Sequence, residues 1–61
     1  MTYEIHARGE AADPWRMIVR AESLEDIEAC FSLLSSTGRY AALELRTEAS
    51  ARPLRTWTRA A

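Results

Sequence analysis

The sequence predicts an α+β domain of two layers, in which one helix packs on a small antiparallel sheet in the order ββαβ, with a fourth strand expected at the end. Three observations lead to this class. Residues 3–8 and 15–21 alternate between apolar and polar side chains, residues 23–36 carry the apolar spacing of a helix, and alternation returns at residues 40–47. Since a single helix can cover only one face of the sheet, the other face should stay open.

The two amino-terminal strands should form a hairpin. Tyr3, Ile5 and Ala7 are expected to face the core, with Glu4, His6 and Arg8 on the open face. Gly9, Asp13 and Pro14 place a turn before the second strand. In that strand the alternation puts two sets on opposite sides: Trp15, Met17, Val19 and Ala21 inward, and Arg16, Ile18 and Arg20 outward.

The helix is expected to begin after Ser23, a good capping residue, and to end at Thr37 and Gly38. Its buried stripe should be formed by Leu24, Ile27, Phe31 and Leu34, with Cys30 at the border.

Two further strands should complete the sheet. In the third strand Ala41, Leu43 and Leu45 should point inward and Ala42, Glu44 and Arg46 outward. Residues 48–61 form either an edge strand over 54–59 or a tail, and the strand is preferred. The expected spatial order is 2-1-3-4.

Length and composition limit the classes of function that the chain can have. With 61 residues, 48% hydrophobic and 28% charged, the chain should form one globular domain over residues 1–61. An enclosed ligand pocket would hollow out most of so small a core, so binding by an outer surface is favoured over catalysis. One cysteine and one histidine cannot build a Cys/His zinc site, and no cofactor is expected. The absence of a leader or a long apolar run favours a bacterial cytoplasm and no membrane partner.

The start of the helix is the first candidate binding surface. It is acidic at Glu22, Glu25, Asp26 and Glu28, and residues 22–38 contain no positive charge. Acids there stabilise the positive end of the helix dipole, which is a sufficient structural reason for them. They can also meet a basic partner, and Leu33, almost opposite the buried stripe, is a candidate apolar anchor among the carboxylates.

The open sheet face is the alternative surface. Arginines at positions 8, 16, 20 and 46, with Trp57, suggest recognition of phosphates and stacking on bases. Against this, Glu4 and Glu44 should pair with arginines across strands, and the chain has a formal net charge of −1. Cys30 and His6, the only pair that could serve as nucleophile and base, are expected on opposite sides of the sheet, so no catalytic residues are predicted.

The stretch "YEIHAR…PWRMIVRAESLEDIEACFSLLSSTGRYAALELRT", within residues 3–47, resembles the small ββαβ proteins of phages and other mobile elements, among them anti-CRISPR-type inhibitors. The resemblance implies a stoichiometric inhibitor that occupies a site on a nucleic-acid-processing complex, such as a CRISPR effector. The sequence thus favours a non-enzymatic protein-binding module, with a small nucleic-acid-binding protein as the alternative and an enzyme or an antitoxin-like subunit as a third option. It does not determine the oligomeric state.

Overall fold

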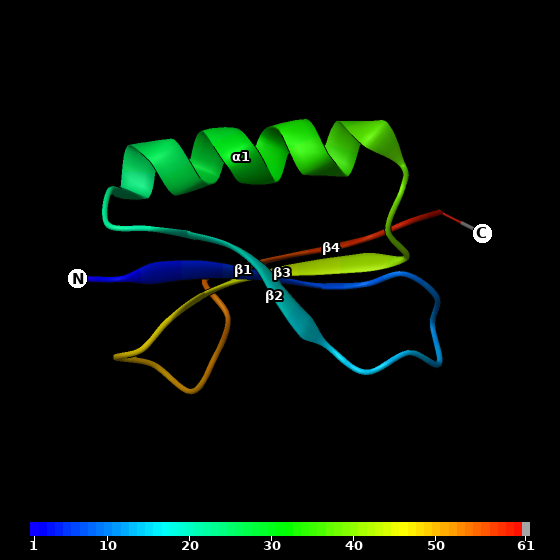
Figure 1. The fold of residues 1–61 in the computed structure, drawn as a ribbon, viewed down its shortest axis with the longest axis horizontal. Coiled ribbons are helices and arrows are strands. Elements are labelled where there is room, and N and C mark those ends of the chain that lie inside the picture. Colours follow the sequence, from blue (N-terminus) through cyan, green and yellow to red (C-terminus); the bar gives the residue numbers. More distant parts are fainter. Residues whose placement is uncertain (61) are drawn as a thin grey trace.

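The computed structural model describes residues 1–60, in which one helix lies across one face of a four-stranded antiparallel sheet (Figure 1). The elements follow one another as β1 (Tyr3–Arg8), β2 (Arg16–Ala21), α1 (Leu24–Thr37), β3 (Ala42–Thr47) and β4 (Arg55–Thr58). The strands are ordered β2-β1-β3-β4. The predicted α+β class, the strand order and the fourth strand are confirmed; residue 61, at the end of the predicted domain, lies outside the described residues.

Both ends of α1 are stabilised by local interactions. The hydroxyl of Ser23 accepts a hydrogen bond of 3.3 Å from the backbone N–H of Asp26, which supplies an acceptor for one of the unpaired amides of the first turn. At the other end Gly38 adopts φ 66°, the left-handed conformation that ends many helices and that glycine reaches without strain. The helix therefore spans the residues that its capping signals predict.

The core lies between α1 and the two central strands. Its buried apolar side chains are Ile5, Ala7, Ile27, Phe31, Leu43 and Leu45. The faces predicted for β1 and β3 are confirmed, because Ile5 pairs with Leu45 and Ala7 with Leu43 on the helix side. Leu24 was expected in the buried stripe and is 43% exposed. It is the first residue of α1, where fewer neighbours surround a side chain.

The faces predicted for β2 are wrong for its first half because the strand contains a bulge. Ile5 pairs with Val19, but His6 then pairs with Met17 and Ala7 with Arg16, so Ile18 is the extra residue. A bulge lets two consecutive side chains approach the same side of a sheet. Ile18 and Val19 both pack against the core, whereas Met17 is turned to the open face and is 48% exposed.

The face predicted for Trp57, in β4, is also reversed. Trp57 pairs with Leu43 and packs against the core, and Arg55 pairs with Leu45. Arg55 therefore reaches the helix. Its Nη1 lies 3.9 Å from Glu28 Oε1, and the central carbon of its guanidinium group lies 5.4 Å from the centroid of the Phe31 ring. Arg59 lies on the same side and donates a 3.2 Å hydrogen bond to the carbonyl of Gly38. In this short, mostly polar strand the sequence pattern offered little to fix the register.

Within residues 1–60, no helix combines the length and the apolar character needed to cross a membrane.

Candidate binding face on the open side of the sheet

In the part of the chain that the structure describes, no helix or strand covers the sheet face that points away from α1. The connections between β1 and β2 and between β3 and β4 both drop below the sheet at its two ends, so they frame this face (Figure 1). Strand pairing assigns ten side chains to the face: Glu4, His6, Arg8, Met17, Arg20, Ala42, Glu44, Arg46, Thr56 and Thr58. We call it the open sheet face.

A tryptophan that the sequence placed in the core lies on the open sheet face instead. Trp15 precedes β2, at the end of a connection held by its own hydrogen bonds. Asp13 Oδ2 accepts from the N–H of Glu10 at 3.0 Å, and the N–H of Asp13 donates to the Glu10 carbonyl at 3.0 Å. The connection folds on itself and the bulge follows it, so the alternation of β2 does not extend to Trp15.

Two arginines from different strands contact the Trp15 ring. The central guanidinium carbon of Arg8, from β1, lies 4.5 Å from the ring centroid, and that of Arg46, from β3, lies 5.6 Å away. Both distances are within the range of cation–π attraction. Arg8 also donates from Nη1 to the Ala11 carbonyl at 3.1 Å, which ties the side chain to the connection that carries Trp15. We call Trp15, Arg8 and Arg46 the tryptophan clasp.

Two glutamates on the open sheet face have partners along their own strands. The prediction that they pair with arginines across strands was therefore wrong. Glu44 Oε1 accepts from Arg46 Nε at 2.7 Å and also forms an ion pair with Arg46 Nη2. Glu4 Oε1 lies 2.9 Å from Nε2 of His6. The charge of Arg46 is therefore balanced locally. Among residues 1–60 no carboxylate lies within ion-pair distance of Arg8.

A hollow of about 340 Å³ adjoins the tryptophan clasp. Arg8 and Trp15 form part of its wall, together with Glu44 and the hydroxyl-bearing residues Thr56 and Thr58. Trp57 borders it too, although this residue packs on the core through its pairing with Leu43. The hollow therefore combines an aromatic surface, a cation and hydroxyl groups at one place.

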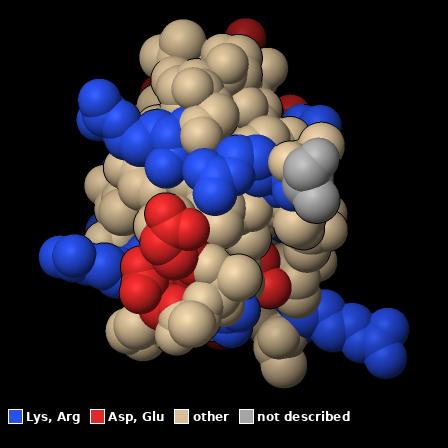
Figure 2. All heavy atoms as spheres, turned by 90° about the vertical axis from the view of Figure 1, so that its right-hand side faces the viewer, with Lys and Arg blue, Asp and Glu red and all other residues tan. Residues whose placement is uncertain are grey.

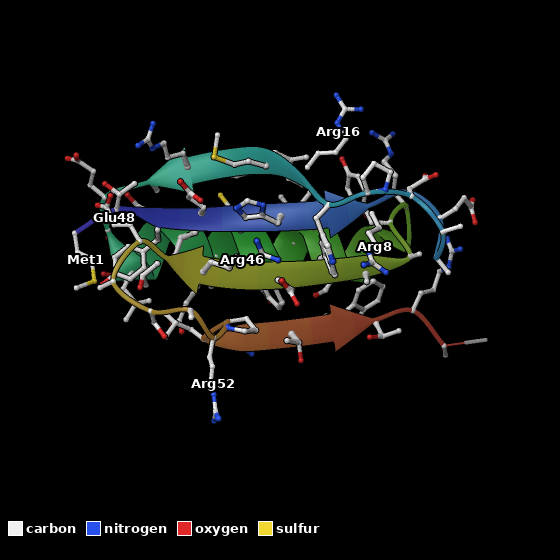
Figure 3. All side chains as sticks on the ribbon, turned by 90° about the horizontal axis from the view of Figure 1, so that it is seen from below. Met1, Arg8, Arg16, Arg46, Glu48 and Arg52 are labelled. Carbon is white, nitrogen blue, oxygen red and sulfur yellow. The ribbon has the colours of Figure 1, made fainter. Side chains whose placement is uncertain are left out.

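The predicted arginine and tryptophan set is only partly brought together. Arg8, Arg20 and Arg46 lie on the open sheet face, as expected. Arg16 pairs with Ala7, a helix-side residue, and projects past the β2 edge of the sheet, whereas Arg8 and Arg46 lie over the strands (Figure 3). The prediction was therefore wrong for Arg16 and Trp57. Trp15 takes the place expected for Trp57, and the turn signals before it were the only hint.

The predicted helix surface does not form one patch. Glu22 and Glu25 are exposed, and Asp26 is exposed while its N–H serves the Ser23 cap. Glu28 turns toward Arg55. Leu33 is 67% exposed, as predicted, but it lies seven residues after Asp26, about 10 Å further along the axis. Leu33 is therefore not surrounded by carboxylates from its own helix.

The remaining charges are mixed in sign. Figure 2 looks at the end of the molecule where α1 finishes, and arginine side chains form a belt there with acidic side chains below it. Arg59 lies 3.7 Å from Glu10 Oε2 in this region. A second hollow, of about 590 Å³, lies on the helix side among Asp13, Arg16, Ile18 and Tyr40. Neither region presents one sign of charge.

The residue types that carry catalysis or bind metals are dispersed. Cys30 borders the core under α1 and His6 lies on the open sheet face, so the sheet separates them. Among the described residues no group of three or more His, Cys, Asp or Glu side chains is placed to hold a metal ion.

Comparisons with protein-family models, with curated proteins and with solved structures found no match to this chain.

Proposed function

We propose that the chain is a non-enzymatic protein-binding module and that its partner docks on the open sheet face. The observation that carries this proposal is the tryptophan clasp, in which Trp15 lies on an uncovered sheet face with Arg8 4.5 Å and Arg46 5.6 Å from its ring.

The residue types on the open sheet face are those that dominate protein interfaces. Tryptophan and arginine are the most enriched residues at interface hot spots, and methionine is enriched as well. Met17 is 48% exposed on this face, where it pairs with His6. The contacts of Arg8 with Trp15 and Ala11 hold the aromatic ring in place before a partner arrives, which reduces the entropy lost on binding.

The helix surface is the weaker candidate. Its acids have local roles, since Glu25 and Asp26 lie in the first turn, where carboxylates complement the helix dipole, and Glu28 faces Arg55. Leu33 offers a single exposed side chain with no aromatic or arginine beside it on α1, whose sequence is LEDIEACFSLLSST. A lone exposed leucine is common on protein surfaces.

A nucleic-acid ligand is the alternative, favoured by Arg8, Arg20, Arg46 and Trp15 on one uncovered face. Two observations make a nucleic-acid ligand less favoured than a protein partner. Arg46 is already paired with Glu44, and guanidinium groups already stack on the indole where a base would have to lie. The resemblance to anti-CRISPR-type inhibitors suggests a nucleic-acid-processing complex as one partner to try, and a cytoplasmic site of action follows from the same proposal.

Site-specific photocrosslinking tests the proposal. A benzophenone amino acid replaces Met17 in one variant and Leu33 in a matched control, and each is irradiated in a lysate of the source cells with and without nuclease. We expect position 17 to give a discrete protein adduct that survives nuclease treatment and position 33 to give none. An adduct from position 33 alone would place the partner on the helix.

The alternative has its own signature. A ligand bound through phosphates loses affinity as salt rises, with a logarithmic slope of ~0.9 per neutralised duplex phosphate. We expect no binding of short duplex or single-stranded oligonucleotides at physiological salt. Tight binding with that slope, lost in Arg8→Ala plus Arg20→Ala, would replace the protein-binding proposal.

A further inference from the structure

Arg8 differs from the other arginines around the sheet because it has a buried hydrogen-bond donor without an acceptor. Its Nε is buried and has no hydrogen-bond partner, and it is the only side-chain atom of this kind among residues 1–60. Arg46, Arg55 and Arg59 each have a carboxylate within ion-pair distance, whereas Arg8, like Arg16 and Arg20, has none among residues 1–60. A buried donor without an acceptor destabilises the free protein. Since solvent does not reach this atom, a ligand that supplies the acceptor recovers that free energy by drawing the guanidinium slightly toward the hollow.

The stacking of Arg8 on Trp15 determines how a ligand can approach. The central guanidinium carbon lies over the indole ring, 4.5 Å from its centroid, so the ring covers one side of the group and the N–H edge that it leaves open is available for recognition. That edge matches the two oxygens of a carboxylate, and N–H donors on a charged group form the stronger class of hydrogen bonds. Stacking also limits the motion of the side chain, so less entropy is lost when a ligand binds.

The hollow beside Arg8 gives a ligand room. Its volume of about 340 Å³ accommodates a side chain or two, and Thr56 and Thr58 offer hydroxyl groups on the wall. Glu44 also lines it, and its carboxylate would repel an anion if it were free. Both of its short contacts are with Arg46, so the charges of this pair offset each other and Arg8 remains as the unbalanced cation.

We propose that this hollow receives a carboxylate side chain, Asp or Glu, from the protein partner, with Arg8 as the residue that recognises it and Trp15 as the ring that holds the Arg8 side chain beside the hollow. The inference rests on the proposed function, which it deepens by giving the partner an acidic residue. A phosphate group would find the same donors and is distinguished by the test.

NMR spectroscopy of the ¹⁵N-labelled chain tests the site directly. The probe is the blocked tripeptide acetyl-Gly-Glu-Gly-amide, and its matched control is acetyl-Gly-Gln-Gly-amide, which has the same shape without the charge. We expect the glutamate peptide to shift the Arg8 Nε–H and Trp15 indole N–H signals in a saturable way and the glutamine peptide to leave them unchanged. Arg8→Lys should weaken the effect at least about tenfold, because the ammonium group cannot make the forked contact. Arg20→Lys, on the same face, should not.

Three results would overturn the inference. They are equal shifts from both peptides, no saturable shift up to tens of millimolar, and tighter binding of hexathymidylate than of the glutamate peptide at the same two signals. The first two leave the protein-binding proposal standing if the Met17 crosslink forms as expected. The third would count against both proposals, since it would make the hollow a phosphate site.

Discussion

His6 of β1 pairs with Met17 of β2, although continuous alternation from the pair Ile5–Val19 would oppose it to Ile18. This one-residue shift moves Met17 to the open sheet face and brings Ile18 against the core. A slip of one residue reverses the face of every side chain beyond it. The composition of the open sheet face therefore depends on this bulge.

The bulge predicts opposite costs for two neighbouring truncations. Ile18→Ala should lower the free energy of unfolding by about 2 kcal/mol, because it removes side-chain atoms that pack against the core. Met17→Ala should change it by less than about 0.5 kcal/mol, because that side chain is half exposed. Chemical denaturation of both variants measures the difference. A larger loss from Met17→Ala would mean that β2 has the continuous register.

Most of the fold could be predicted from the sequence, because each strong sequence pattern was compatible with one local structure only. The alternation of apolar residues in β1 and β3 matches the side chains that are buried there. Ser23 and Gly38 mark the two ends of α1. The candidate site could not be predicted in the same way. Trp15 owes its place to the folded connection before it and to the bulge after it, and Trp57 owes its place to a register set by pairing with Leu43. Neither place follows from alternation along one segment, because both depend on how the chain pairs with a neighbouring strand.

Phe31 tests the position of the core. The side chain is 4% exposed, so Phe31→Ala should cost about 3 to 5 kcal/mol. That loss is comparable with the whole free energy of unfolding expected for a chain of this length, about 3 to 9 kcal/mol. We expect the variant to be largely unfolded at room temperature by circular dichroism. Ser32→Ala, at an exposed position of α1, is the control and should melt near the wild-type temperature; if the two variants melt alike, the buried stripe of α1 is misassigned.

Gly38 tests the end of the helix. Its φ of 66° is unfavourable for side chains with a Cβ, and among residues 1–60, apart from Gly38 and its two chain neighbours, no atom lies within 4 Å of where that Cβ would be. Gly38→Ala should therefore cost about 1 to 2 kcal/mol through backbone conformation alone, and Gly38→Asn should cost less, since asparagine tolerates this region. Thermal melts of the pair give the comparison. Alanine as stable as glycine would show that α1 ends in another conformation.

Substitutions of the acids at the start of α1 test whether these side chains only stabilise the helix or also attract a partner. Glu25→Gln and Glu28→Gln should each cost no more than about 1 kcal/mol, the first through the helix dipole and the second through its exposed pair with Arg55. Neither should alter the rate at which the crosslinked partner associates. Slower association that recovers as salt rises would instead show that these carboxylates steer a basic partner.

The affinity of the crosslinked partner for two single variants tests the central claim most directly. Met17→Glu and Leu33→Glu place the same charge at two exposed apolar positions, 48% and 67% exposed, on opposite sides of the molecule. Both should fold like the wild type. If the partner docks on the open sheet face, Met17→Glu should raise Kd by about 30-fold, which corresponds to ~2 kcal/mol, and Leu33→Glu should leave Kd unchanged. Loss of binding in Leu33→Glu with wild-type affinity in Met17→Glu would contradict the account and return the interface to the helix.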